Sequence, residues 1–317
     1  MSGRSLRVLF FGTPAFAVPT LAAMLASRHD VVGVVTQPDR PRGRGQRTTD
    51  GPVKAAALDA GLTVLQPATL KDDSLTVAMH DMAADIGVVT AYGKILPERL
   101  LAIPPLGMIN VHASLLPKYR GAAPIHRAVI AGERETGVTI MRVVKALDAG
   151  AMLAKVQTPI DPDETSEAVE HRLATLGARL LVDTLDRLAS GPIHEEPQDD
   201  GAATYAHRLV REDGIIDWSR TAEAIHHQAR GLHPWPLAYT FAEGRRWIIR
   251  RTAWTTTDTG ALPGTIVTAH GDELAIATGR GLLQVRELQL EGKRPMTPRE
   301  LLTGYRIAPG TRLMSTP

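Results

Sequence analysis

The stretch of sequence that decides the fold is residues 6–36, LRVLFFGTPAFAVPTLAAMLASRHDVVGVVT. Two runs of apolar and β-branched residues, 6–11 and 31–36, predict strands, and the segment between them predicts a helix over about 14–27. Pro14 suits the first turn of that helix, because its missing N–H would have no helical partner there. A strand, a helix and a second strand in this order are typical of a parallel sheet wrapped by helices.

The same alternation continues through the first half of the chain. Further strands are expected at residues 85–91, 108–112 and 138–143, and helices at 125–131 and 165–190. Gly191 and Pro192 end the second of these helices. We therefore predict an α/β catalytic domain over residues 1–190, Rossmann-like, with a doubly wound and mostly parallel sheet.

The sequence changes character after residue 190. Residues 191–207 contain few apolar side chains and predict a linker. One helix is expected at 221–231, followed by strands at 247–254, 265–270, 273–278 and 282–290. Short strands separated by glycines predict a small C-terminal β-barrel over residues 208–317, of the OB-like kind.

Length and composition limit the classes of protein. The 317 residues suit about two domains. The absence of cysteine excludes disulfides, thiolate metal ligands and a cysteine nucleophile. No stretch approaches the ~18 apolar residues of a membrane span, and the first apolar run is too short for a signal peptide. These features predict a cytoplasmic protein with no membrane partner.

Charge and periodicity indicate the kind of partner. The net charge is only +2, but the excess of Lys and Arg lies in the C-terminal third, which favours a polyanionic partner there. No heptad pattern or long apolar edge requires a second copy, so we expect a monomer. The sequence lacks the glycine-rich signature of a dinucleotide site and the lysine of a P-loop.

Residues 107–125, GMINVHASLLPKYRGAAPI, carry the polar groups best suited to chemistry. Asn110 and His112 lie two apart on a predicted strand, so both side chains leave the same face at its carboxyl end, where open α/β sheets bind ligands. Asn110 is the only asparagine in the chain. An amide can donate to a developing oxyanion and an imidazole can move a proton. Taken alone, the pair is more typical of a strand end whose side chains satisfy neighbouring backbone groups.

Asp148 adds a third polar group. It follows the predicted strand 138–143, close to Gly150, and its carboxylate could orient His112 and favour the charged ring. Taken alone, an aspartate before a glycine is typical of a solvated turn. Pro117 cannot continue a regular strand, so the chain turns away just after His112. Three loop-borne polar groups at one sheet edge predict an active site.

Two basic regions point to a nucleic acid. The arginine loop, residues 37–51, is longer than most strand-to-helix connections, and Gly43 and Gly45 leave its backbone free to adapt. A basic surface loop without a ligand is the alternative. The predicted barrel offers a second basic group, for which a solvated exterior is the alternative. The candidate phosphate-binding residues are Arg40, Arg42, Arg44, Arg47, Arg245, Arg246, Lys293 and Arg294.

At this point the sequence resembles a known superfamily. Asn110 and His112 together with segments 114–121 and 147–150 are similar to the formyltetrahydrofolate-dependent formyltransferases and hydrolases. Segments 11–14, 36–41, 43–45, 51–54 and 91–97 resemble the branch that formylates methionyl-tRNA. The resemblance covers nearly the whole chain.

The resemblance implies transfer of the formyl group of 10-formyltetrahydrofolate to the α-amine of the initiator methionyl-tRNA, without a metal. Asn110 and His112 would steady the tetrahedral oxyanion, and Asp148 would tune His112 and help relay the proton. The arginine loop would enter the end of the acceptor stem, with Arg44 the best single candidate. The implied folate-binding residues are Ser114, Leu115, Leu116 and Pro117, with Tyr92, Gly93, Ile95, Leu96 and Pro97 at the pterin.

Other functions remain open from sequence. A formyltransferase acting on a sugar nucleotide or on glycinamide ribonucleotide would use the same donor chemistry, and a hydrolase of the formyl donor would use water in place of the amine. An RNA-binding module with an inert sheet would need neither. The arginine loop and the basic barrel favour a macromolecular polyanion over a small acceptor.

Overall fold

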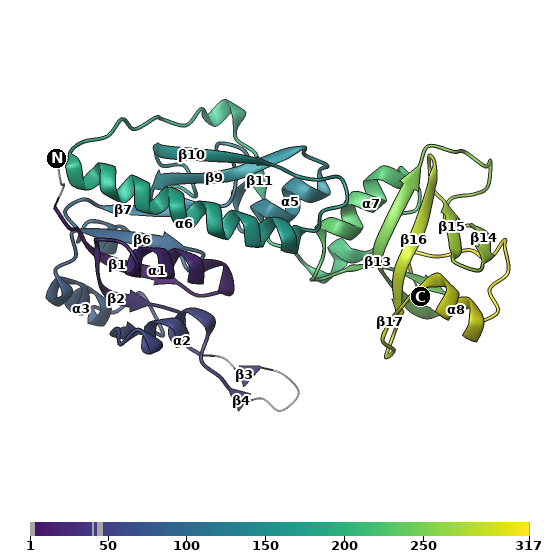
Figure 1. Cartoon of the computed structure of the whole chain (residues 1–317), viewed down its shortest axis with the longest axis horizontal. Coiled ribbons are helices and arrows are strands. Elements are labelled where there is room, and N and C mark those ends of the chain that lie inside the picture. The colour runs from purple at the N-terminus through teal and green to yellow at the C-terminus, as the bar shows by residue number, and fades with distance from the viewer. Residues whose placement is uncertain (1–3, 40, 43–46, 317) are drawn as a thin grey trace. The chain divides into compact units, whose positions relative to one another are not determined.

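The structure is a computed structural model that describes residues 4–39, 41–42 and 47–316 (Figure 1). It contains two compact units. The first comprises Met1–Pro124, Thr136–Thr158 and Glu170–Ala206, and the second comprises Ile125–Glu135, Pro159–Val169 and His207–Pro317. The division at residues 190 and 208 that we expect from sequence stays a prediction.

The first unit is built on a mixed sheet. In the described part of the chain seven strands follow the order β10-β9-β7-β6-β1-β2-β5. The pairs from β7 through β6, β1 and β2 to β5 are parallel, whereas β9 runs antiparallel to β7. The strands are β1 (Arg7–Gly12), β2 (Asp30–Val35), β5 (Val64–Leu65), β6 (Ile86–Thr90), β7 (Met108–His112), β9 (Glu135–Arg142) and β10 (Met152–Pro159).

Helices cover the sheet. The long helix α6 (Ser166–Ser190) approaches β7 and β9 closely at Gly177, where an added Cβ would lie 2.9 Å from a methyl group of Val111 and 3.2 Å from one of Val138 (Figure 1). No helix among the described residues combines the length and the apolar composition needed to cross a bilayer. The other helices before residue 131 are α1 (Val18–Leu25), α2 (Pro52–Asp59), α3 (Ser74–Met82), α4 (Glu98–Leu101) and α5 (Pro124–Ile130).

Burial explains the central strands. Val8, Leu9, Phe10 and Phe11 are all fully buried, because β1 lies between β2 and β6 and both of its faces are covered. Such a strand is apolar along its whole length and has no alternating pattern. The predicted α/β class is confirmed.

The sheet places several loops at one edge. The chain runs from β1 to β2 on one side and later returns to β6 on the other side of β1, so the sheet reverses its winding there. The carbonyl of Tyr92, just after β6, accepts hydrogen bonds from Thr13 Oγ1 at 3.1 Å and Gln37 Nε2 at 2.7 Å. The loops after β1, β2 and β6 are thereby joined at the carboxyl edge, where such sheets bind ligands.

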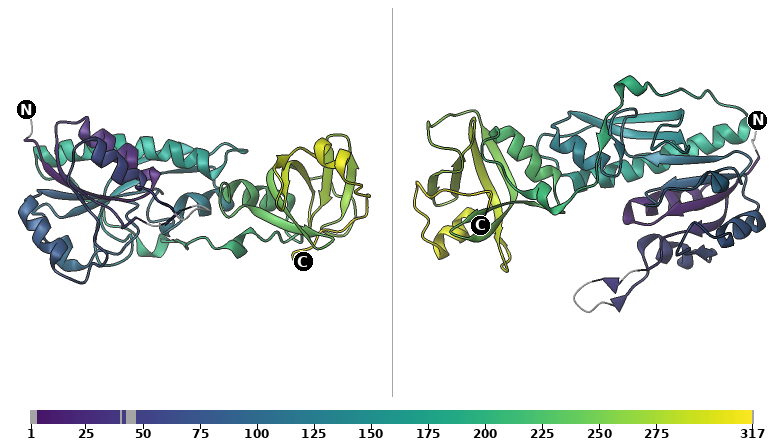
Figure 2. Two further views of the ribbon diagram at one scale, coloured as in Figure 1. Left: turned by 90° about the horizontal axis from the view of Figure 1, so that it is seen from below. Right: turned by 180° about the vertical axis from the view of Figure 1, so that it is seen from behind.

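The second unit contains an antiparallel sheet. Its strands follow the order β12-β13-β16-β15-β14, with β17 paired to β16, and they curl around one apolar core that includes Trp218, Trp247 and Ile249 (Figure 2). The strands and helices are β12 (Ala238–Ala242), β13 (Arg245–Thr255), β14 (Ile266–His270), β15 (Glu273–Ala277), β16 (Leu282–Leu290), β17 (Pro295–Met296), α7 (Ala222–Gly231) and α8 (Pro298–Gly304).

The C-terminal segment joins the two edges of this sheet. Met314 exchanges backbone hydrogen bonds with Phe241 on the edge strand β12. Two residues away, Thr265 and Arg312 form an antiparallel bridge, and Ile266 on the other edge strand, β14, donates to the Thr311 carbonyl. The predicted barrel therefore corresponds to an antiparallel sheet whose edges are bridged by residues 311–314. Edge strands paired in this way expose fewer open hydrogen-bonding groups.

Candidate active site

Asn110 and His112 lie on one face of β7. Val111 between them faces α6, so the two polar side chains point to the opposite side of the sheet. Across the antiparallel pair, Met141 lies opposite Asn110 and Thr139 lies opposite His112. The His112 side chain is 6% exposed, and Asn110 is half-buried. Among the described residues, none forms a hydrogen bond with the side-chain amide of Asn110, which leaves this group available to a ligand.

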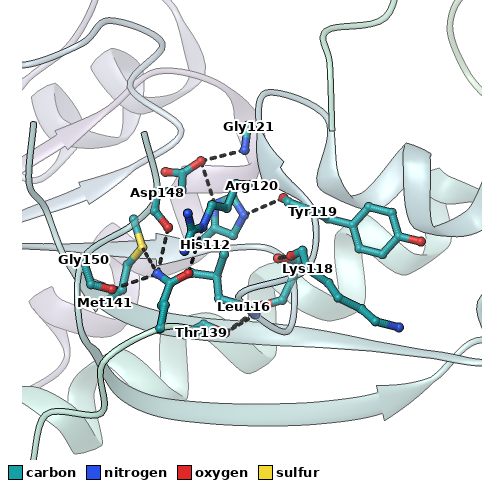
Figure 3. Close-up of polar contacts among 12 residues, drawn as sticks. His112, Leu116, Lys118, Tyr119, Arg120, Gly121, Thr139, Met141, Asp148 and Gly150 are labelled. Atoms are coloured by element: carbon teal, nitrogen blue, oxygen red, sulfur yellow. Dashed lines mark hydrogen bonds and ion pairs between the residues drawn. The ribbon is translucent and has the colours of Figure 1, made fainter. Parts of the chain in front are cut away.

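Asp148 meets His112 on this face. Its Oδ2 lies 3.7 Å from His112 Nδ1 and accepts a hydrogen bond from the Gly121 N–H at 2.7 Å (Figure 3). Its backbone adopts the left-handed conformation, with φ of 48°, which aspartate tolerates better than most residues. The structure thus brings His112 and Asp148 together, and places Asn110 on the same face of the same strand as His112.

The route by which Asp148 reaches His112 differs from our prediction. We expected both residues near the carboxyl ends of their strands, at one edge of the sheet, but β9 is antiparallel to β7 and its last residue, Arg142, lies opposite Ile109. The loop after β9 instead folds back over the sheet face. At Gly150 it passes so close to β9 that a Cβ would lie 1.9 Å from the Arg142 carbonyl oxygen. Loop conformation rather than strand direction brings the carboxylate to the imidazole.

Both ring nitrogens of His112 face acceptors. Nε2 lies 3.0 Å from the carbonyl oxygen of Tyr119, and Nδ1 faces the Asp148 carboxylate. A neutral imidazole donates from only one nitrogen, whereas the imidazolium donates from both. A substrate oxygen that reaches the ring would take the place of one of these two partners.

The turn after β7 is held internally. Ser114 is fully buried, and its Oγ donates to the Lys118 carbonyl at 2.6 Å. Thr139 Oγ1 donates to the Ser114 carbonyl at 2.8 Å and accepts from the Leu116 N–H at 3.2 Å. Leu116 packs against Met141 and Met152. The predicted folate-binding segment of Ser114, Leu115, Leu116 and Pro117 therefore directs at least the Ser114 and Leu116 side chains into the protein.

The loop after β6 has one exposed apolar side chain. The Tyr92 ring is buried and packs edge-on against Phe11, and burial raises the pKa of its phenol to about 12. Leu96 is buried as well, whereas Ile95 is 80% exposed. Tyr92 can thus reach a ligand only through its backbone, as we expect for the segment that also includes Gly93 and Pro97.

The basic residues fall into two groups. Arg40 and Arg44 lie outside the described residues, while Arg42 and Arg47 face each other across the backbone pair of β3 (Pro41–Arg42) and β4 (Arg47–Thr48). The second group lies at one end of the C-terminal sheet. Its members are Arg245, Arg246, Lys293 and Arg294.

Contacts within the C-terminal unit bring this second group together. Arg246 stacks 3.8 Å above the Tyr239 ring, and its carbonyl accepts from the N–H of Glu291, two residues before Lys293. Arg294 forms an ion pair with Glu300 at 2.6 Å. The sequence could not show this proximity, because nearly fifty residues separate Arg245 from Lys293.

Two residues near the site carried no predicted role. Arg120 is 3% exposed, and its Nε donates to Gln198 Oε1 at 2.9 Å, while Nη2 pairs with Asp200 at 2.7 Å. Gln198 lies in the segment that we predict as a linker. The signal for Arg120 was its place in the motif Tyr119-Arg120-Gly121, but no sequence signal separates Gln198 from other polar residues of residues 191–207.

The described residues contain no group of three or more His, Asp or Glu side chains that could hold a metal ion. The candidate site brings together an amide, an imidazole and a carboxylate. These groups can donate to a developing oxyanion and move a proton.

Comparisons with known proteins agree with this chemistry. Residues 6–185 match the formyl transferase family, and residues 208–306 match the formyl transferase C-terminal domain. The methionyl-tRNA formyltransferase of Heliobacterium modesticaldum is 49% identical over 315 residues, covering 97% of this chain and 99% of the relative. That of Geotalea uraniireducens is 46% identical over 308 residues, covering 97% and 98%.

Solved structures share the fold. An N-formyltransferase from Helicobacter canadensis, in complex with folinic acid and dTDP-3-aminofucose, has a TM-score of 0.67 at 17% identity, over 88% of this chain and 99% of that one. HypX from Aquifex aeolicus, in complex with tetrahydrofolic acid, has a TM-score of 0.63 at 14% identity, over 94% of this chain and 47% of HypX. The chain belongs to the formyl transferase family, matches the models of both family domains, and aligns with methionyl-tRNA formyltransferases along almost their whole length.

Proposed function

We propose that this protein transfers the formyl group of 10-formyltetrahydrofolate to the α-amino group of initiator methionyl-tRNA, in the cytoplasm. The observation that carries the proposal is the His112–Asp148 pair, 3.7 Å apart, on the face of β7 that also presents Asn110. It is supported by 46–49% identity to methionyl-tRNA formyltransferases over nearly the full length of both chains.

The proposed reaction forms one bond and breaks one. The free α-amine attacks the formyl carbon, and its lone pair forms the new C–N bond while the carbonyl oxygen takes up negative charge. When the carbonyl re-forms, the bond from that carbon to N10 of the folate breaks. One proton leaves the attacking nitrogen and one is delivered to N10, so the balance requires no oxidant or reductant.

The three polar residues supply complementary functions in this reaction. Asn110 donates a hydrogen bond to the oxyanion, an interaction that strengthens only as charge develops. His112 donates to the same oxygen or passes a proton toward the leaving nitrogen. Asp148, held by the Gly121 N–H, orients His112 and helps relay the proton that leaves the amine to N10 of the departing folate.

We place the folate against the loops that follow β6 and β7. Segments 92–97 and 114–117 both begin at the carboxyl edge of the sheet, beside His112 and Asn110. The exposed Ile95 offers apolar surface to a ring system.

We place the tRNA on the basic residues. The C-terminal group is suited to phosphate, because within the described residues only Arg294 of its four members is engaged in an ion pair, and the arginine loop supplies further positive charge. The initiator identity of the tRNA and a monomeric state are part of the proposal. Neither is decided by the residues of the catalytic face.

A single-turnover assay with labelled 10-formyltetrahydrofolate tests the proposal. The acceptors are methionyl-tRNA, uncharged tRNA, free methionine and an amino-sugar nucleotide, each at matched concentration. We expect label to move to methionyl-tRNA alone. Transfer to the sugar nucleotide would instead establish a small-acceptor formyltransferase, and release of labelled formate without an acceptor would establish a hydrolase.

A further inference from the structure

We propose that Gln198 is a positioning residue for the formyl transfer, holding Asp148 against His112 with Arg120 as its buried support. This inference rests on the proposed function for its kinetic consequence. Its structural content concerns only the loop after β9 and the segment 198–204, both in the first unit.

The side-chain amide of Gln198 donates two hydrogen bonds to the loop after β9. Its Nε2 donates to the carbonyl of Asp148 at 2.8 Å and to the carbonyl of Gly150 at 2.8 Å. A primary amide has two N–H donors, so one side chain uses its whole donor capacity on residues on either side of Ala149. Two such bonds fix the backbone from which the Asp148 carboxylate projects, a backbone in the left-handed conformation.

Arg120 fixes the orientation of that amide. Its buried guanidinium donates to Gln198 Oε1 at 2.9 Å, so the oxygen must face Arg120 and the NH₂ must face the loop. A buried guanidinium is costly unless its donors are satisfied. Arg120 also pairs with Asp200 at 2.7 Å. Loss of Gln198 would therefore leave both the loop carbonyls and one guanidinium donor without their partners.

The same segment also holds Tyr119, whose carbonyl is the hydrogen-bond partner of His112. Thr204 Oγ1 accepts from the Tyr119 N–H at 2.8 Å, and the Thr204 carbonyl accepts from the Arg120 N–H at 2.8 Å. The Tyr119 carbonyl in turn lies 3.0 Å from His112 Nε2 (Figure 3). Residues 198–204 thus hold, from one continuous stretch, both acceptors that face the imidazole.

The consequence for catalysis is geometric. Without the two Gln198 bonds the Asp148 loop samples positions away from His112, and a displacement of about 1 Å in a catalytic group can lower a rate by about 10²-fold. We expect Gln198→Ala to lower kcat by 10–100-fold, while KM for methionyl-tRNA changes less than twofold. Gln198→Glu keeps the size and the acceptor for Arg120 but loses both donors, and should lose kcat to a similar degree.

A matched control exists in the second unit. Gln228 Nε2 donates to the carbonyls of Asp213 and Ile215 at 2.8 and 2.9 Å, the same pattern of two carbonyls two residues apart. Gln228→Ala should lower the melting temperature and leave kcat within twofold. If this variant fails to fold, Ser190→Ala, which removes an exposed bond to the Asp186 carbonyl near the end of α6, serves instead.

A double-mutant cycle and hydrogen exchange complete the test. If Gln198 acts through Asp148, then Gln198→Ala lowers kcat less than twofold further in the Asp148→Asn background. Independently of activity, Gln198→Ala should speed amide exchange in the peptides that contain Gly121 and residues 145–151, and the Gln228 variant should not. Wild-type protein that fails to formylate methionyl-tRNA overturns the proposed function, whereas the exchange measurement still decides whether Gln198 holds the loop.

Two results would overturn the inference. One is wild-type kcat together with wild-type exchange in Gln198→Ala. The other is a full additive loss in the double variant, because it would mean that Gln198 acts by a route that does not pass through Asp148.

Discussion

At the candidate active site, Gly150 is the position at which adding one carbon should lower the rate of formyl transfer most. An alanine Cβ there would lie 1.9 Å from the Arg142 carbonyl oxygen and 2.8 Å from its carbonyl carbon, whereas real Cβ contacts essentially never fall below 3.0 Å. Both atoms belong to the backbone of β9, which cannot rotate aside. The loop must therefore move by about 1.1 Å, and Asp148, two residues earlier, moves with it.

The magnitude follows from this displacement. A shift of about 1 Å in a catalytic group costs about 10²-fold in rate, or about 2.7 kcal/mol of barrier. We expect Gly150→Ala to show that loss in single-turnover formylation of methionyl-tRNA, with the melting temperature lowered by a few degrees. Gly304→Ala is the control: it ends α8, a Cβ there meets nothing within 4 Å, and its rate should equal that of the wild type.

The reasoning fails if Gly150→Ala turns over at the wild-type rate while remaining folded. That result would mean one of two things. Either the loop does not pass against β9 in solution, or catalysis tolerates a displacement of Asp148 by about 1.1 Å. A crystal structure of the variant separates the two explanations, because only the second keeps the loop displaced.

Three further outcomes are expected. Asn110→Ala should raise the barrier by about 2.7–4 kcal/mol with little change in folate KM, measured by pre-steady-state kinetics, if its amide meets the oxyanion. Burial and the neighbouring Arg230 lower the pKa of His227 to about 4, so between pH 4 and 6.5 the unfolded chain binds a proton that the folded chain does not. The free energy of unfolding should therefore fall as the pH drops from 6.5 toward 4. In His227→Gln the melting temperature should fall less over the same pH range. Replacing Arg245 and Lys293 by glutamine should lower the salt slope of tRNA binding by about one per residue, and an unchanged slope would remove this surface from the tRNA interface.

Local sequence was enough for the elements whose pattern is strong. The strand expected at residues 108–112 coincides with β7, and the helix expected at 165–190 differs from α6 by one residue. In both cases the spacing of the apolar residues matches the period of the element, so these residues share the face that is buried. The short helices α2 and α3 and the strand β10 were not predicted, because their apolar residues follow neither period clearly.

The proposed catalytic residues were predictable as residue types and only partly as an arrangement. Asn110 and His112 share a face because strand geometry alone requires it. The expected meeting of Asp148 with His112 relied on strand direction, and β9 runs the other way. A loop that folds back across the sheet cannot be read from spacing, since its path depends on what it packs against.

The sequence by itself determined the α/β class, the strand that presents Asn110 and His112, and the kinds of groups available for acyl transfer, because each depends on near neighbours in the chain. Only the tertiary structure decided that β9 is antiparallel, that Asp148 returns to His112, and that Gln198, fifty residues later, holds it there. Those features depend on hydrogen bonds between distant segments, whose energy exists only once the chain has folded.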